Sequence, residues 1–182
     1  MDKIMIGWAD TQHAQSQALA DTSDLLEVQR VDRQRFVARF HAKTFVCGPD
    51  GEVGEVTGYE IGYTFRENYL RHVEPLEVLS WLHPRGVFHP NARAPVCCVG
   101  HITPGTPLVD LLYRTYEVVS GQNVMPDEKD ALNPVACQWA RNNPHRFPLD
   151  DRPLKRRTLD GRPGALELPG SLGLPRSLEL PK

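Results

Sequence analysis

Residues 35–65 read RFVARFHAKTFVCGPDGEVGEVTGYEIGYTF, and this stretch decides the fold. Apolar and polar side chains alternate over residues 36–46, a period of two that is typical of a strand with one buried face. The GPDG sequence at 48–51 predicts a turn, because proline presets φ and glycine tolerates positive φ. Every second residue over 59–65 is then aromatic or aliphatic. The stretch therefore predicts an antiparallel hairpin.

The segments on both sides of this hairpin complete a mixed pattern. Residues 10–31 carry a weak apolar stripe that predicts a helix, and residues 73–82, VEPLEVLSWL, predict a further strand. Over residues 107–119 the apolar side chains recur at intervals of three and four, which predicts a second helix. Asn133 is a good N-cap and Pro134 a good first helical residue, so a third helix is expected there. The order of elements indicates the α+β class.

Composition and charge exclude several classes of partner. The formal net charge of −2 provides no basic field for nucleic acid or for an anionic membrane surface. No apolar run approaches the roughly 18 residues of a membrane helix. The N-terminus has an acid at position 2 and no continuous apolar stretch, so we expect no secretory signal and a cytoplasmic protein.

Four cysteines are spaced neither as CxxC pairs nor as a zinc finger, so free thiols and no metal are expected. Cys47 and Cys137 stand in apolar surroundings and are predicted to be small buried hydrophobes. Cys97 and Cys98 are adjacent and follow a His-Pro-Asn turn at residues 89–91. Because neighbouring side chains of an extended segment point in opposite directions, only one of the two thiols should be accessible.

The composition changes after Pro148. Residues 149–182 are rich in proline and glycine and contain near-repeats of Leu-x-Leu-Pro. We therefore expect a domain over residues 1–148 and a tail over 149–182 that buries too little apolar area to fold by itself. The repeats could dock in extended form on a partner, and a flexible tail without a partner is the alternative.

The order of these elements and motifs resembles that of the ubiquitin-conjugating enzymes. The resemblance rests on GYEIGYTFRENYLRHVEPLEVLSWLHPRGVFHPN at 58–91 and on DALNPVACQWARNN at 130–143, in that order, and covers roughly residues 10–145. It implies a ubiquitin-conjugating fold: an N-terminal helix, a four-stranded antiparallel meander, the His-Pro-Asn turn, an active-site cysteine and two helices.

The sequence also departs from the eukaryotic members of that family. The segment between the His-Pro-Asn turn and the cysteine is short, GHITPGTP stands at 100–107 in place of the usual Trp-Ser-Pro stretch, and the tail stands where the last two helices would lie. These departures resemble the ubiquitin-conjugating-like proteins of bacterial operons that also encode a ubiquitin-like protein and an activating enzyme. Several such operons act in defence against phage.

The resemblance implies an acyl carrier without a metal or small cofactor. Its cysteine would accept a ubiquitin-like protein from an activating enzyme and pass it to an amine on a protein target, and residues 10–30 would contact the activating enzyme. Cys98 is favoured over Cys97 as nucleophile, because Cys98 lies nine residues after His89 and 32 before Asp130, close to the family spacing. Asn91 would stabilise the oxyanion that forms when the amine attacks the thioester, and Asp130 would orient that amine and accept its proton.

Alternatives remain open for these residues. Asn91 could instead shape its own loop through side-chain bonds to the backbone, and Asp130 could belong to a solvated acidic loop with Asp127 and Glu128. Two other functions compete with the transferase: a catalytically silent adaptor of the same fold, and a redox protein that uses Cys97 and Cys98. A vicinal pair lacks the CxxC helix start that lowers a thiol pKa, which counts against the redox function.

Overall fold

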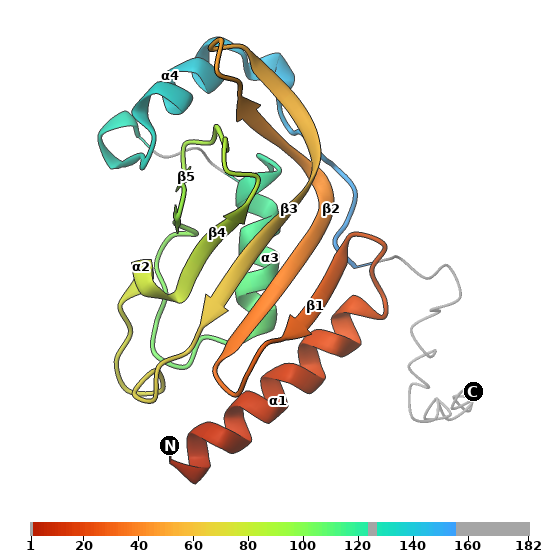
Figure 1. Ribbon diagram of the computed structural model, residues 1–182, viewed down its shortest axis with the longest axis vertical. Helices are drawn as coiled ribbons and strands as arrows, with labels where there is room; N and C mark the ends of the chain where they lie inside the picture. Colours follow the sequence, from red (N-terminus) through yellow and green to blue (C-terminus); the bar gives the residue numbers. More distant parts are fainter. Residues whose placement is uncertain (1, 124–126, 156–182) are drawn as a thin grey trace, which may run out of the picture.

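A computed structural model describes residues 2–123 and 127–155 of the 182 residues. The chain forms an α+β domain with one antiparallel sheet in the strand order β1-β2-β3-β4-β6-β5 (Figure 1). The helices and strands, in chain order, are α1 (Lys3–Ala20), β1 (Leu26–Arg30), β2 (Arg35–Cys47), β3 (Val53–Thr64), α2 (Pro75–Val78), β4 (Leu79–His83), β5 (Ala92–Arg93), β6 (Val96–Cys97), α3 (Leu108–Val119), the 3-10 turn η1 (Glu128–Asp130), α4 (Pro134–Asn142) and the 3-10 turn η2 (Pro144–Arg146).

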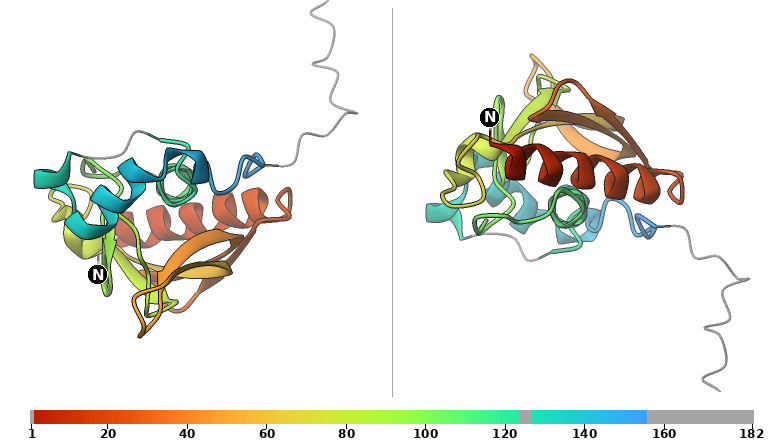
Figure 2. Two further views of the ribbon diagram at one scale, coloured as in Figure 1. Left: turned by 90° about the horizontal axis from the view of Figure 1, so that it is seen from above. Right: turned by 90° about the horizontal axis from the view of Figure 1, so that it is seen from below.

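The hairpin predicted from residues 35–65 is confirmed. β2 and β3 pair antiparallel along most of their length, with one register shift between Phe40 and Lys43. The alternating residues of β3 are fully buried and form the floor of the main core. Helices α1 and α3 lie together on this face of the sheet (Figure 2). The other face carries exposed charges such as the Arg39–Glu60 ion pair at 2.7 Å.

Two predicted elements need correction. The helix expected over 10–31 is α1, which begins at Lys3 and ends at Ala20, and the chain returns over 26–30 as strand β1. Leu26 and Val28 belong to β1 because they pair with Phe40 and Ala38 of β2. The long-range pairing outweighs a weak helical stripe. The strand expected over 73–82 begins instead with the helical turn α2, which Pro75 starts, and continues as β4.

The helices expected after Pro107 and at Asn133 are confirmed as α3 and α4. The α3 residues that recur at three and four positions face the core, and Thr115 among them accepts a hydrogen bond from the buried Tyr63 hydroxyl at 2.8 Å. The Asn133 side chain accepts a hydrogen bond from the Ala136 amide at 3.1 Å, which caps α4 as predicted.

Past Pro148 the described chain continues as an extended segment, residues 149–155, that we call the C-terminal strap (Figure 1). Leu149 and Leu154 are buried. Hydrogen bonds join the backbone of the strap to the folded domain. Leu149 N donates to Ser120 O. The carbonyls of the strap accept from the domain: Asp150 O from Gln122 Nε2, Arg152 O from Tyr116 OH, and Leu154 O from Ser23 Oγ. The packed body therefore extends beyond the boundary expected at Pro148, and residues 156–182 of the expected tail lie outside the described residues.

Candidate functional site

The His-Pro-Asn turn is held by its buried histidine. His89 is 3% exposed, and its Nδ1 accepts a hydrogen bond from the Asn91 amide at 3.0 Å. Burial lowers the pKa of His89 to about 4, and a hydrogen bond with the Val118 backbone opposes this only in part. The imidazole is therefore neutral near pH 7 and its Nδ1 remains an acceptor. His89 therefore positions the turn from its buried side.

The short hairpin β5–β6 decides which cysteine faces outward. Its register pairs Ala92 with Cys97, and both are buried. Just beyond the two strands, the backbones of Asn91 and Cys98 are joined by a hydrogen bond from Cys98 N to Asn91 O of 2.8 Å. Residues directly opposite each other in an antiparallel pair share one face, and successive residues alternate. Cys97 therefore faces the core and Cys98 the opposite side, and the turn residue Asn91 meets Cys98 through its backbone carbonyl.

The two adjacent thiols differ in exposure. Cys97 is 1% exposed and Cys98 is half-buried. Burial raises the pKa of Cys97 to about 12, with a smaller effect of Cys98 in the same direction, so Cys97 holds practically no thiolate at neutral pH. None of the four cysteines, all of which lie in the described part of the chain, forms a disulfide. This arrangement disfavours a redox pair, because a buried neutral thiol cannot attack its neighbour.

The sheet and the helix α4 hold this hairpin from two sides. The Trp81 amide of β4 donates to the Pro95 carbonyl at 2.8 Å, which joins the hairpin to the sheet. On the other side, the Asn133 amide at the start of α4 donates to the Pro90 carbonyl at 3.1 Å. Asn133 thus caps α4 with its side chain and ties the helix to the His-Pro-Asn turn with its backbone.

This tie places the acidic segment beside the candidate site. Asp130 ends η1, three residues before Asn133, and is exposed together with Asp127 and Glu128. The Asp127 carboxylate contacts Arg141 of α4 at 3.4 Å. The backbone bond from Asn133 to Pro90 thus keeps the segment that ends at Asp130 close in the chain to a residue tied to the His-Pro-Asn turn.

An aromatic cluster fixes α4 against the sheet. Trp139 of α4 packs edge-on against Phe45 of β2 at 4.9 Å between ring centroids and against Phe88 at 5.8 Å. Phe88 directly precedes His89, and its amide donates to the Phe45 carbonyl at 2.8 Å. The cluster thus links the long strand β2, the His-Pro-Asn turn and α4 as one rigid unit.

The segment after Cys98 is anchored by a residue that the sequence did not single out. Gly100 has a φ of 86°, a conformation that favours glycine and turns the chain away from the hairpin. The Arg114 guanidinium of α3 then donates to the His101 carbonyl at 2.6 Å. His101 itself is exposed. No sequence signal marks Arg114, because its partner is a backbone carbonyl in a distant loop.

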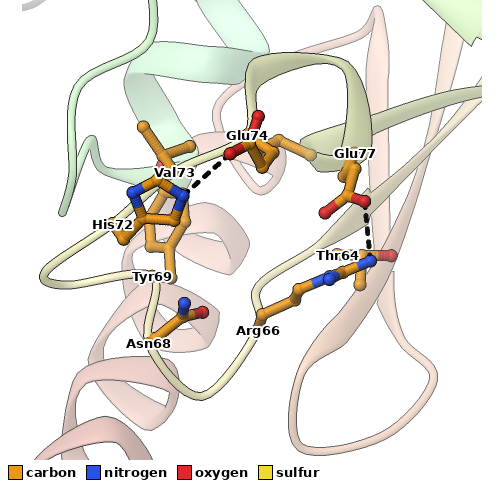
Figure 3. Close-up of a pocket in the computed structure, with 9 residues that line it drawn as sticks. Thr64, Arg66, Asn68, Tyr69, His72, Val73, Glu74 and Glu77 are labelled. Carbon is orange, nitrogen blue, oxygen red and sulfur yellow. Dashed lines mark hydrogen bonds and ion pairs between the residues drawn. The ribbon is translucent and has the colours of Figure 1, made fainter.

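A separate cavity of about 230 Å³ lies where β3 leads into α2, and it includes none of the candidate site residues (Figure 3). Its charged side chains already pair with one another: Arg66 with Glu77 and His72 with Glu74, each at 2.8 Å. Both contacts are exposed to solvent and are therefore weak. We assign no chemistry to this cavity.

Within residues 2–123 and 127–155 no group of three or more His, Cys, Asp or Glu is arranged to hold a metal ion. Among the same residues, no helix combines the length and the apolar character that crossing a membrane requires. The candidate site comprises the groups around the hairpin: one half-buried thiol, one side-chain amide, and a nearby acidic segment.

The exposure difference predicts the order in which the cysteines react. In the native protein an alkylating reagent should modify Cys98 and the half-buried Cys47, whereas Cys97 and Cys137 should react only after unfolding. Mass spectrometry of the alkylated peptides measures the order. Native alkylation of Cys97 ahead of Cys98, or a Cys97–Cys98 disulfide in the purified protein, would contradict the outward placement of Cys98.

Comparison with models of known protein families finds no match for this sequence, and comparison with curated proteins finds none either. The functional assignment therefore depends on the geometry of the hairpin and on the sequence motifs that surround it.

Proposed function

We propose that this chain is a bacterial ubiquitin-conjugating-like acyl carrier, with a ubiquitin-conjugating fold, that acts in the cytoplasm and possesses Cys98 as its nucleophile. Its partners are a ubiquitin-like protein, an activating enzyme and a protein target, and its setting is an operon of the kind that defends against phage. The observation that supports the proposal is the β5–β6 hairpin, in which Cys97 is buried, Cys98 is half-buried, and the Cys98 amide donates to the Asn91 carbonyl at 2.8 Å.

The first step of the proposed cycle is a transthiolation. The Cys98 thiolate attacks the carbonyl carbon of the ubiquitin-like protein's C-terminal thioester on the activating enzyme. A new bond forms between that carbon and Cys98 Sγ, the bond to the activating enzyme's sulfur breaks, and that sulfur leaves as a thiolate. ATP is consumed upstream, so this step requires no further cofactor here.

The second step transfers the acyl group to an amine. A neutral target amine attacks the thioester carbonyl, the bond from carbon to Cys98 Sγ breaks, and an amide forms while Cys98 leaves as a thiolate. The Asn91 side-chain amide donates a hydrogen bond to the oxyanion that develops during this attack. Asp130 orients the amine and accepts its proton, directly or through water.

A lysine amine is mostly protonated near neutral pH, because its ordinary pKa is about 10.4. A carboxylate alone would favour the charged form still further, so the target amine must also lose water as it enters the site. Asp130 is exposed in the free protein. In the proposed mechanism the target lysine therefore loses its water only when the target protein is bound to this chain.

The test is a charging assay with the activating enzyme and the ubiquitin-like protein that the proposal expects the same operon to encode. With ATP, the wild-type chain should form an adduct that a reducing agent removes, and Cys98→Ser should form an oxyester that the reducing agent leaves intact. Cys98→Ala should form no adduct, while Cys97→Ala, the matched control one residue away, should still be charged. Charging lost in Cys97→Ala and kept in Cys98→Ala would move the nucleophile by one residue.

A silent adaptor of the same fold is the alternative outcome of this assay. It would bind the activating enzyme or the ubiquitin-like protein without forming any covalent adduct. The half-buried, free Cys98 beside Asn91 favours the carrier over the adaptor, since an adaptor does not need an accessible thiol at this position.

A further inference from the structure

A shallow groove runs between α1 and α3 at the point where the C-terminal strap ends. It encloses about 460 Å³, within the range of roughly 300–1,000 Å³ that is usual for ligand pockets. Apolar side chains from both helices line it, and Asp110 and Lys155 stand among the polar residues of its wall. The view from below shows α1 and α3 side by side, with the strap reaching them (Figure 2). Its apolar lining comprises Ala18, Leu19, Pro107, Val109 and Tyr113.

The C-terminal strap ends at this groove, so the residues that follow it start there. Leu154 is buried, and its carbonyl accepts a hydrogen bond from the Ser23 hydroxyl just after α1. Lys155, the last described residue, lines the groove. Residues 156–182 therefore start from a fixed point at the groove, so any contact they make there closes only a short loop.

The sequence beyond the strap repeats a motif with two leucines on one side. Leu-Glu-Leu-Pro at 166–169, Leu-Gly-Leu-Pro at 172–175 and Leu-Glu-Leu-Pro at 178–181 follow one another at a spacing of six. In an extended chain the first and third residues of each repeat point to the same side. The proline that follows disfavours a helix at the residue before it and keeps the repeat extended.

We propose that the first of these repeats, residues 166–169, docks within the same molecule in the groove between α1 and α3. Leu166 and Leu168 cover the apolar residues of the groove, and Glu167 points to solvent. The first repeat is the occupant because it is the nearest to Lys155. Ten residues lie between Lys155 and Leu166, and the eleven Cα-to-Cα steps span up to about 36 Å, so the repeat can turn back to the groove without strain.

A shorter connection also gives a higher effective concentration at the groove, which favours the first repeat over the two later ones. Docking covers the C-terminal half of α1 and the first turns of α3. It would leave the hairpin with Asn91 and Cys98 uncovered, since that hairpin belongs to the other end of the sheet (Figure 1). The docked tail does not depend on the proposed transferase activity.

The test compares full-length chains by NMR. In the wild type, the methyl groups of Leu166 and Leu168 should show nuclear Overhauser contacts to the Tyr113 ring. In the double variant Leu166→Ser/Leu168→Ser these contacts should be lost, and the amide resonances of Ala18 and Val109 should shift. Glu167→Gln, which changes the side chain that points away, is the matched control and should leave the groove resonances in place.

A substitution in the groove gives an independent readout. Ala18 is exposed, so Ala18→Glu leaves the core intact but places a charge where the leucines would pack. The variant should move the Leu166 and Leu168 methyl resonances to the positions they have in a short free peptide of the same sequence.

Three results would overturn the proposal. The first is an absence of contacts between the tail leucines and Tyr113. The second is contacts that disappear on dilution, which would identify the tail of a second copy as the occupant. The third is contacts made by the repeat at 172–175 or 178–181 in place of the one at 166–169.

Discussion

Replacing Asn91 with alanine is expected to slow the discharge of a Cys98 thioester to lysine by roughly 100- to 1,000-fold, the cost of losing one donor to an oxyanion. The hydrogen bond between the Cys98 amide and the Asn91 carbonyl belongs to the backbone and survives in alanine. The hydrogen bond from the Asn91 backbone N–H to His89 Nδ1 also survives, because alanine keeps the same backbone donor. The substitution therefore removes the side-chain donor with little change to the hairpin.

This prediction can be measured without knowing the natural partners. A short peptide that ends in Gly-Gly as an activated thioester loads Cys98 by exchange, and excess free lysine at fixed pH then discharges it. The rate of discharge in wild type and Asn91→Ala gives the effect of the side chain, and the alkylation rate of Cys98 with the thermal midpoint gives the control. An oxyanion role changes only the discharge rate.

The competing role for Asn91 predicts a different set of changes. If its side chain mainly shapes the loop, Asn91→Ala should lower the thermal midpoint and alter the alkylation rate of Cys98, while discharge follows those changes. An unchanged discharge rate with a lowered midpoint would contradict the oxyanion role.

The second large effect is a loss of stability in mild acid caused by His89. The imidazole has an ordinary pKa of 6.5, and burial lowers its pKa to about 4 in the folded chain. Between these values the unfolded state binds a proton at His89 and the folded state does not, so the free energy of unfolding falls as the pH falls from 6.5 towards 4. The full loss from this one residue is about 3 kcal/mol.

Urea unfolding between pH 4.5 and 7.5 measures this loss when wild type is compared with His89→Gln. The glutamine is neutral throughout, so the difference in pH dependence isolates His89 from the other titrating groups. A direct check in the wild type is the imidazole NMR signal, which should not titrate above pH 5. Titration of the His89 signal near pH 6.5 would contradict the burial that holds the turn.

The prediction has a functional counterpart at the same residue. A proton on His89 Nδ1 would remove the acceptor for the Asn91 amide. The turn that presents Asn91 should therefore loosen in the same pH range in which stability is lost, and the lysine discharge rate, once corrected for the protonation of lysine itself, should fall there as well.

Much of the fold followed from local pattern. The period of two in β2 and β3, the period near 3.6 in α3 and the Asn-Pro start of α4 each placed an element correctly, because each pattern is long or carries its own cap. The weak apolar stripe at 10–31 wrongly predicted a helix over residues 26–30. These residues form the short strand β1, which gains its stability from pairing with β2, and local periodicity does not reveal that partner.

The sequence by itself determined the α+β class, the turn that stands before the cysteines and the presence of two adjacent thiols. Only the tertiary structure decided which thiol is accessible. The pairing of Ala92 with Cys97 turns that side chain into the core, and a shift of one residue would have exchanged the two cysteines. The strap over 149–155 was likewise decided by tertiary contacts, since its backbone bonds reach residues far away in the chain. Local sequence determines which secondary structure a segment favours by itself. Strand register and long-range hydrogen bonds depend in addition on the segments that pack against it in the folded chain.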